Sequence, residues 1–127
     1  MSSEFKIEEI KSDGFLHSRI YEFIYEPQNK LFKVNLGFGD LKEGGAVVDC
    51  TITITDWWDL EVIEKGKNIF KRYLNAEIPT DTDQIIKYEY AENILTLKTY
   101  GSLSIDSVLY YIFTKPKIKI TGEYDPD

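Results

Sequence analysis

The stretch Val47-Val48-Asp49-Cys50-Thr51-Ile52-Thr53-Ile54-Thr55 decides the fold class. Apolar residues (Val48, Cys50, Ile52, Ile54) alternate there with polar ones (Asp49, Thr51, Thr53, Thr55). Successive side chains of a strand point to opposite faces, so this pattern predicts a strand with one buried face and one face in water. Cys50 falls on the apolar face, where we expect a small core residue and not a nucleophile.

Alternation of this kind recurs along the chain, and short turns separate the segments, which favours antiparallel pairing. Gly66 to Glu77 has apolar residues at helical spacing instead. The sequence therefore predicts a mainly β (α+β) domain over residues 1–127. We expect one antiparallel sheet curled into a sandwich or open barrel, with about seven or eight strands and one short helix near 66–77. The other expected strands are Arg19–Glu26, Leu31–Phe38, Gln84–Ala91, Ile94–Tyr100, Ser104–Thr114 and Lys117–Thr121.

Composition narrows the class of protein. The chain has 127 residues, one cysteine, one histidine and a net charge of −7. It has no Cys/His cluster, so we expect no metal and no cofactor. Acids stand near the N-terminus where a signal peptide needs an apolar stretch, and the longest apolar run, Val108–Phe113, is too short to cross a bilayer. These features predict a cytoplasmic protein without membrane contact.

The acidic charge is concentrated in the first half of the chain. Residues 1–64 hold 13 acids and 6 bases, and within them residues 40–64 hold seven acids against the single base Lys42. Such a surface repels nucleic acid and attracts a basic protein. The alternative is that the acids only keep the domain in solution. The seven acids are Asp40, Glu43, Asp49, Asp56, Asp59, Glu61 and Glu64.

The segment Asp56-Trp57-Trp58-Asp59-Leu60-Glu61 is the strongest candidate for a binding site. Continued alternation would place Trp58 inside and Trp57 outside, but Asp56 breaks the pattern, so either Trp57 or Trp58 should lie on the wet face among carboxylates. One exposed indole with a charged rim is typical of an interface hot spot. Two core tryptophans around a bulge are the alternative. The predicted partner-binding residues are Asp40, Glu43, Asp56, Trp57, Trp58, Asp59 and Glu61.

Nothing in the sequence assembles a catalytic site. His17 is the sole histidine, and its neighbour Ser18 would point to the opposite face of an extended strand. We therefore expect no enzymatic activity and assign no catalytic residue. Two other functions stay open: a carrier or enzyme whose pocket is lined by Tyr88, Tyr90, Tyr100, Tyr110 and Tyr111, and a structural subunit that forms a homodimer.

The chain resembles the small cytoplasmic immunity proteins of bacterial polymorphic-toxin and contact-dependent inhibition systems. The resemblance rests on an early strand, Phe15–Ile20, that leads into a hairpin, on the block Ile52–Leu60, and on the acidic single-domain build. It implies tight binding to a cognate, often basic, toxin domain whose active site is blocked, with no catalysis by the immunity protein.

Overall fold

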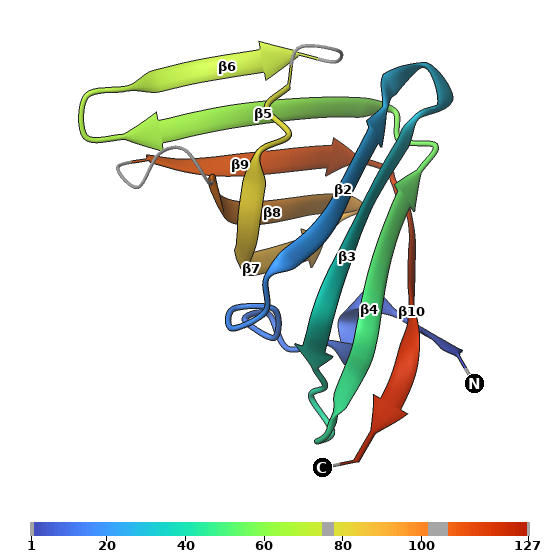
Figure 1. The fold of residues 1–127 in the computed structure, drawn as a ribbon. Helices are drawn as coiled ribbons and strands as arrows, with labels where there is room; N and C mark the ends of the chain where they lie inside the picture. The colour runs from blue at the N-terminus through green and yellow to red at the C-terminus, as the bar shows by residue number, and fades with distance from the viewer. Residues whose placement is uncertain (1, 75–77, 102–106, 127) are drawn as a thin grey trace.

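Antiparallel strands make up most of the computed structural model, which describes residues 2–74, 78–101 and 107–126 (Figure 1). Two 3-10 turns, η1 and η2, accompany ten strands in these residues. The elements are β1 (Ser3–Phe5), η1 (Ile7–Glu9), β2 (Ile20–Glu26), η2 (Pro27–Asn29), β3 (Leu31–Asp40), β4 (Ala46–Thr55), β5 (Asp59–Gly66), β6 (Phe70–Leu74), β7 (Thr82–Ala91), β8 (Ile94–Gly101), β9 (Ser107–Thr114) and β10 (Lys117–Asp125).

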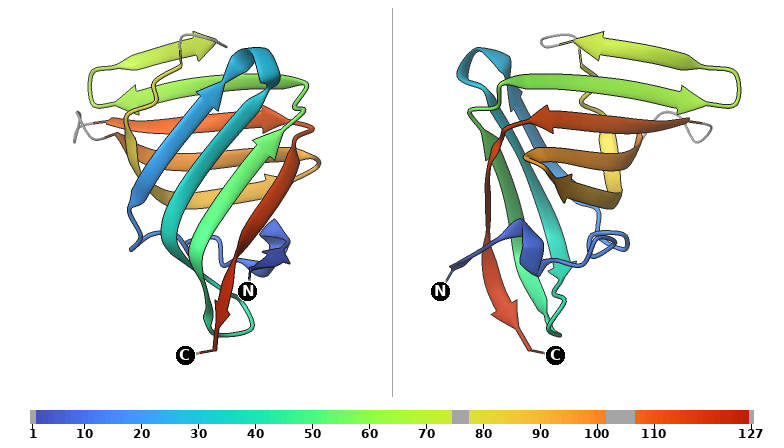
Figure 2. Two further views of the ribbon diagram at one scale, coloured as in Figure 1. Left: turned by 45° about the vertical axis from the view of Figure 1, so that its right-hand side comes forward. Right: turned by 180° about the vertical axis from the view of Figure 1, so that it is seen from behind.

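The strands form two five-stranded sheets, which we call the first and the second sheet. The first has the order β1-β10-β4-β3-β2 and the second the order β6-β5-β9-β8-β7. Strands of the two sheets cross at a steep angle, and the chain passes between them at the β4–β5 and β9–β10 connections (Figure 2). The sheets do not close into a barrel. The mainly β, antiparallel prediction is thus confirmed.

Both connections between the sheets use a left-handed residue. Asp56 follows β4 with a φ of 54°, and Lys115 follows β9 with a φ of 49°. A single left-handed residue turns the chain sharply where continued extended backbone would keep it in its own sheet. The two sheets are therefore joined by tight corners and face one another.

The core fills the space between the facing sides of the sheets. Phe32 on β3 packs edge-on against Phe113 and Tyr111 on β9, with ring centroids 5.0 and 5.4 Å apart. Cys50 is fully buried on β4, and its burial raises the pKa of its thiol to about 12. The expectation that Cys50 is a core residue is confirmed.

The face predicted for the start of β4 is wrong at one residue. Asp49 adopts a left-handed φ of 51°, and the register with β10 shifts between Thr121 and Glu123. This β-bulge reverses the alternation, so that Val47 is buried and Val48 is only partly buried. From Cys50 onward the predicted alternation holds.

The helix predicted near 66–77 is absent from the part of that segment that the structure describes. Gly66 ends β5, its N–H donates to the carbonyl of Ile69, and Phe70–Leu74 returns as β6. Residues 75–77 lie outside the described residues. The expected strand number was also too low, because β1, β5 and β6 are not among the expected strands. Strand β10 also runs to Asp125, beyond the expected end at Thr121.

The early strand expected over Phe15–Ile20 is mostly a turn. The N–H of Ser18 donates to the carbonyl of Phe15 at 3.0 Å, and strand β2 starts only at Ile20. The hairpin of β2 and β3 around Pro27–Asn29 was predicted correctly. Within residues 2–74, 78–101 and 107–126, no helix has the length and hydropathy needed to span a membrane.

Candidate protein-binding site

The corner between β4 and β5 separates the two tryptophans. Because Asp56 is left-handed, the alternation of β4 does not continue through it. Trp57 turns into the core with 3% of its surface exposed, whereas Trp58 turns outward with 71% exposed. The sequence left open which indole is exposed and whether both are buried; the structure exposes Trp58, although uninterrupted alternation would have exposed Trp57.

Trp57 anchors the corner from inside. Its ring stacks near Tyr25 with centroids 6.4 Å apart and meets the edge of Phe113 at 5.4 Å. The Lys30 ammonium donates a hydrogen bond of 2.8 Å to the Trp57 carbonyl. These contacts come from three different strands or turns, so they hold the backbone next to Trp58 in one conformation.

Trp58 is presented on this rigid support. Its backbone N–H donates to the Thr114 carbonyl at 2.8 Å, which ties the corner to the end of β9. The Lys115 ammonium lies 3.6 Å from the centroid of the indole ring, a cation–π contact. The side chain is thus held in position on one face while most of its surface stays open to a partner.

The carboxylates near the corner already have cationic neighbours. Asp56 pairs with Lys117 at 3.2 Å on the surface, and Glu61 pairs with Arg72 at 2.6 Å. Asp59 is exposed at the start of β5. The indole was expected to lie among acids, but the charged group that contacts it is the ammonium of Lys115. The site combines an aromatic anchor with a rim of both signs.

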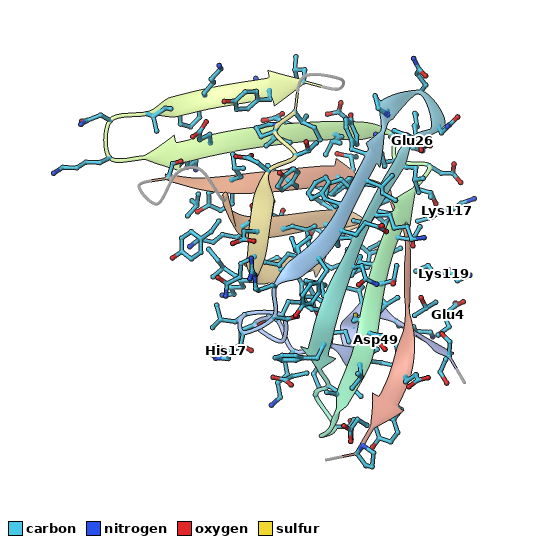
Figure 3. The ribbon with its side chains drawn as sticks, in the orientation of Figure 1. Glu4, His17, Glu26, Asp49, Lys117 and Lys119 are labelled. Atoms are coloured by element: carbon cyan, nitrogen blue, oxygen red, sulfur yellow. The ribbon has the colours of Figure 1, made fainter. Side chains whose placement is uncertain are left out.

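The other predicted acids lie at the opposite end of the first sheet. Asp40 pairs with Ala46 at the start of β4, and Glu43 lies in the turn between β3 and β4. Ten residues separate Ala46 from Asp56, a distance of about 30 Å along a strand. Figure 3 shows Asp49 well down β4 from Lys117, the partner of Asp56. Residues 40–64 therefore contribute to two separate surfaces.

The five tyrosines do not converge on one pocket. Tyr88 and Tyr111 are buried, whereas Tyr100 is 43% exposed and, with Tyr110, lies on the outward side of the second sheet. The Tyr88 hydroxyl donates to the carbonyls of Ile7 and Ile10, and burial raises its pKa.

The second buried tyrosine hydroxyl is also engaged inside the protein. The Tyr111 hydroxyl donates to the Pro79 carbonyl at 2.8 Å and lies 2.5 Å from the Thr82 hydroxyl. An open depression of about 550 Å³ beside Tyr88 and Tyr90 has charges of both signs on its walls, including Glu8 and Lys42. Its size suits a small ligand, but it uses only two of the five tyrosines.

His17 and Ser18 differ in burial, although they lie at the end of a turn and not in the extended strand from which opposite faces were expected. His17 is exposed in the loop before β2 (Figure 3), whereas Ser18 is buried. The Ser18 hydroxyl accepts a hydrogen bond of 3.1 Å from the Phe38 N–H. It therefore supports the packing of the loop on β3. Among the described residues there is no group of three or more His, Cys, Asp or Glu side chains that could hold a metal ion.

Sequence reasoning missed the exposed apolar residues of β6. Phe70 is 70% exposed and Leu74 is 56% exposed. The available signal for a hairpin was the pair Gly66 and Asn68, which lies between two runs that each contain several apolar residues.

The fold and the candidate site together define a class: a two-sheet antiparallel β protein with an aromatic residue exposed on a braced corner. No family model, no curated protein and no solved structure matches the chain.

Proposed function

We propose that this protein is an inhibitor of the immunity type, which neutralises a cognate toxin domain by binding over its active site. Trp58 carries the proposal, because 71% of its surface is exposed while Trp57, next to it, fixes the corner from within. A rigid exposed indole supplies a large contact area at a small entropy cost on binding. The one cysteine of the chain fits a reducing cytoplasm as the place of action.

The charges of the chain support a basic partner at long range. A net charge of −7 attracts a basic toxin domain and raises the rate of encounter. Close to Trp58 the contact is of another kind, because the Lys115 ammonium covers one face of the ring. We therefore assign encounter to the overall charge and affinity to the indole, with Asp59 and Glu61 as rim residues.

Capture from the native host tests the proposal. The wild-type protein and Trp58→Ala serve as bait in parallel, and mass spectrometry identifies proteins retained by the wild type. With the purified partner, Trp58→Ala should weaken binding by about 2–4 kcal/mol, or about 30- to 1,000-fold in Kd. The partner's activity should fall in step with occupancy.

Tyr21→Ala is the matched control. Tyr21 has the same exposed fraction as Trp58, 71%, but lies on β2. It should leave the Kd unchanged. Equal binding by the wild type and Trp58→Ala would show that Trp58 is not in the interface. A partner that keeps its full activity when the protein is bound would contradict the inhibitor role.

A further inference from the structure

Strand β6 is an open edge of the second sheet. It pairs with β5 from Leu74 opposite Glu61 to Phe70 opposite Lys65, and no described residue pairs with its other side. The opposite edge of this sheet is different. There the N–H of Tyr88 on β7 donates to the Ser12 carbonyl, and Gln84 forms a bridge with Arg19.

The register shows which backbone groups of β6 face outward. The hydrogen bond from Gly66 N–H to the Ile69 carbonyl closes the hairpin. Bonded and non-bonded pairs alternate in an antiparallel ladder, so the N–H and carbonyl groups of Phe70, Arg72 and Leu74 point away from β5. These three alternate residues offer an added strand a regularly spaced set of donors and acceptors.

The side chains of this edge favour association. Phe70 and Leu74 are large apolar residues that are 70% and 56% exposed. Natural edge strands are normally protected by bulges, prolines or inward charges, and a hydrophobic edge is a pairing site. Arg72 lies between the two, and its side chain is held on β5 by Glu61 at 2.6 Å.

The charge of the hairpin indicates the kind of strand that fits. Residues 61–74 carry four bases (Lys65, Lys67, Lys71, Arg72) and two acids (Glu61, Glu64) in a chain of net charge −7. Both acids already have partners within the protein. Glu61 pairs with Arg72, and Glu64 accepts hydrogen bonds of 2.8 Å from the hydroxyls of Tyr73 and Ser107. An incoming strand with carboxylates would meet the basic side chains with opposite charge.

A second copy of the chain fits this edge poorly. Antiparallel pairing of β6 with itself about a two-fold axis at Arg72 places Arg72 opposite Arg72 of the other copy and Lys71 opposite Tyr73. Like charges directly opposite one another destabilise a strand pair. Charge therefore favours a different protein.

We propose that the free edge of β6 binds an extended acidic, apolar segment of a partner protein by strand addition. Phe70 and Leu74 supply the apolar contact, and the ammonium groups of the hairpin, with Lys71 on β6 itself, select for carboxylates. This surface acts independently of Trp58, so a Trp58→Ala protein should bind such a segment as the wild type does.

The probe is the acetylated and amidated peptide Glu-Val-Glu-Phe-Glu-Val-Glu, added to the full chain labelled with ¹⁵N. In the free protein the amide protons of Phe70, Arg72 and Leu74 should exchange fast and that of Tyr73 slowly. Saturating peptide should slow the exchange of the three outward amides at least about tenfold. A peptide with lysine in place of each glutamate should leave their exchange unchanged.

Phe70→Pro and Phe70→Thr distinguish the contribution of the backbone N–H at position 70 from that of the phenylalanine ring. Proline is tolerated at an edge position whose N–H faces solvent, but it removes that donor. Threonine keeps the N–H and removes the ring. Phe70→Pro should abolish protection at Arg72 and Leu74, whereas Phe70→Thr should retain it with weaker binding. If Phe70→Pro does not fold, two measurements on the wild type still test the inference. These are the alternating exchange rates of the β6 amides and the comparison of the glutamate peptide with the lysine peptide.

Three results would overturn the inference. One is unchanged exchange at the three outward amides with saturating acidic peptide. Another is equal binding of the glutamate and lysine peptides. The third is a dimer in sedimentation with these amides protected in the absence of peptide, because a second copy would then occupy the edge.

Discussion

Replacing each tryptophan by alanine should have very different effects on stability. Trp57 is 3% exposed and packs against Phe113 and Tyr25, so Trp57→Ala leaves a large cavity at the corner. The expected cost is about 3–5 kcal/mol. Trp58 is 71% exposed and contacts Lys115, so Trp58→Ala should cost about 0.5–1 kcal/mol.

Thermal unfolding followed by far-UV circular dichroism measures the difference without relying on indole fluorescence. For a domain of this size, 1 kcal/mol corresponds to about 4 °C in Tm. Trp57→Ala should therefore lower the Tm by about 12–20 °C and Trp58→Ala by about 2–4 °C. Trp57→Phe keeps an aromatic ring beside Phe113 and should fall between them. A loss for Trp58→Ala that equals or exceeds that for Trp57→Ala would refute the assignment of the inner and outer indole.

Three further predictions concern the core and the corners. The pKa of the Cys50 thiol is raised to about 12, so the folded protein keeps this proton at alkaline pH after the unfolded chain has lost it. The free energy of unfolding should fall by roughly 1 kcal/mol per pH unit above about pH 9, and Cys50→Ala should flatten that slope in urea titrations. Asp56 has a φ of 54°, so Asp56→Val should cost about 1–2 kcal/mol and Asp56→Gly much less; urea midpoints that are equal for the two would contradict this backbone account. A Cβ at Gly122 would lie 2.4 Å from Val47 Cγ1 and 2.7 Å from the Val48 carbonyl oxygen, so Gly122→Ala should cost about 1–3 kcal/mol by the same assay, and an unchanged midpoint would show that the bulge relaxes.

The parts of the fold that sequence predicts well are those with one wet and one dry face. From Cys50 to Ile54 every inward residue is apolar and every outward residue is a threonine, so burial and polarity agree. The β2–β3 hairpin was readable because Pro27 begins its turn. In these elements the inward and outward residues differ clearly in polarity, so alternation predicts both that the segment is a strand and which of its faces is buried.

Strand β6 lacks that contrast. It lies at a sheet edge, and four of its five residues are exposed. Phe70 and Leu74 are four residues apart, a spacing that falls on one face of a strand and on one face of a helix. Apolar spacing alone therefore could not separate the two structures over residues 66–74.

The site was only partly predictable because two of its features depend on three-dimensional geometry. A single left-handed residue, Asp56, decides which indole is exposed, and alternation cannot follow the chain through it. Residues 40–64 are close in sequence, but an extended strand separates Asp40 from Asp56. Lys115 is far from Trp58 in sequence and reaches it through the β9–β10 corner.

Photo-crosslinking from position 58 in the native host tests the binding role of Trp58 most directly. A photoreactive phenylalanine analogue replaces Trp58 in one strain and Tyr21, equally exposed on β2, in another. We expect one dominant crosslinked protein from position 58 and none from position 21. A crosslinking pattern that is the same from both positions, or empty at position 58, would contradict the proposal that this corner binds a partner.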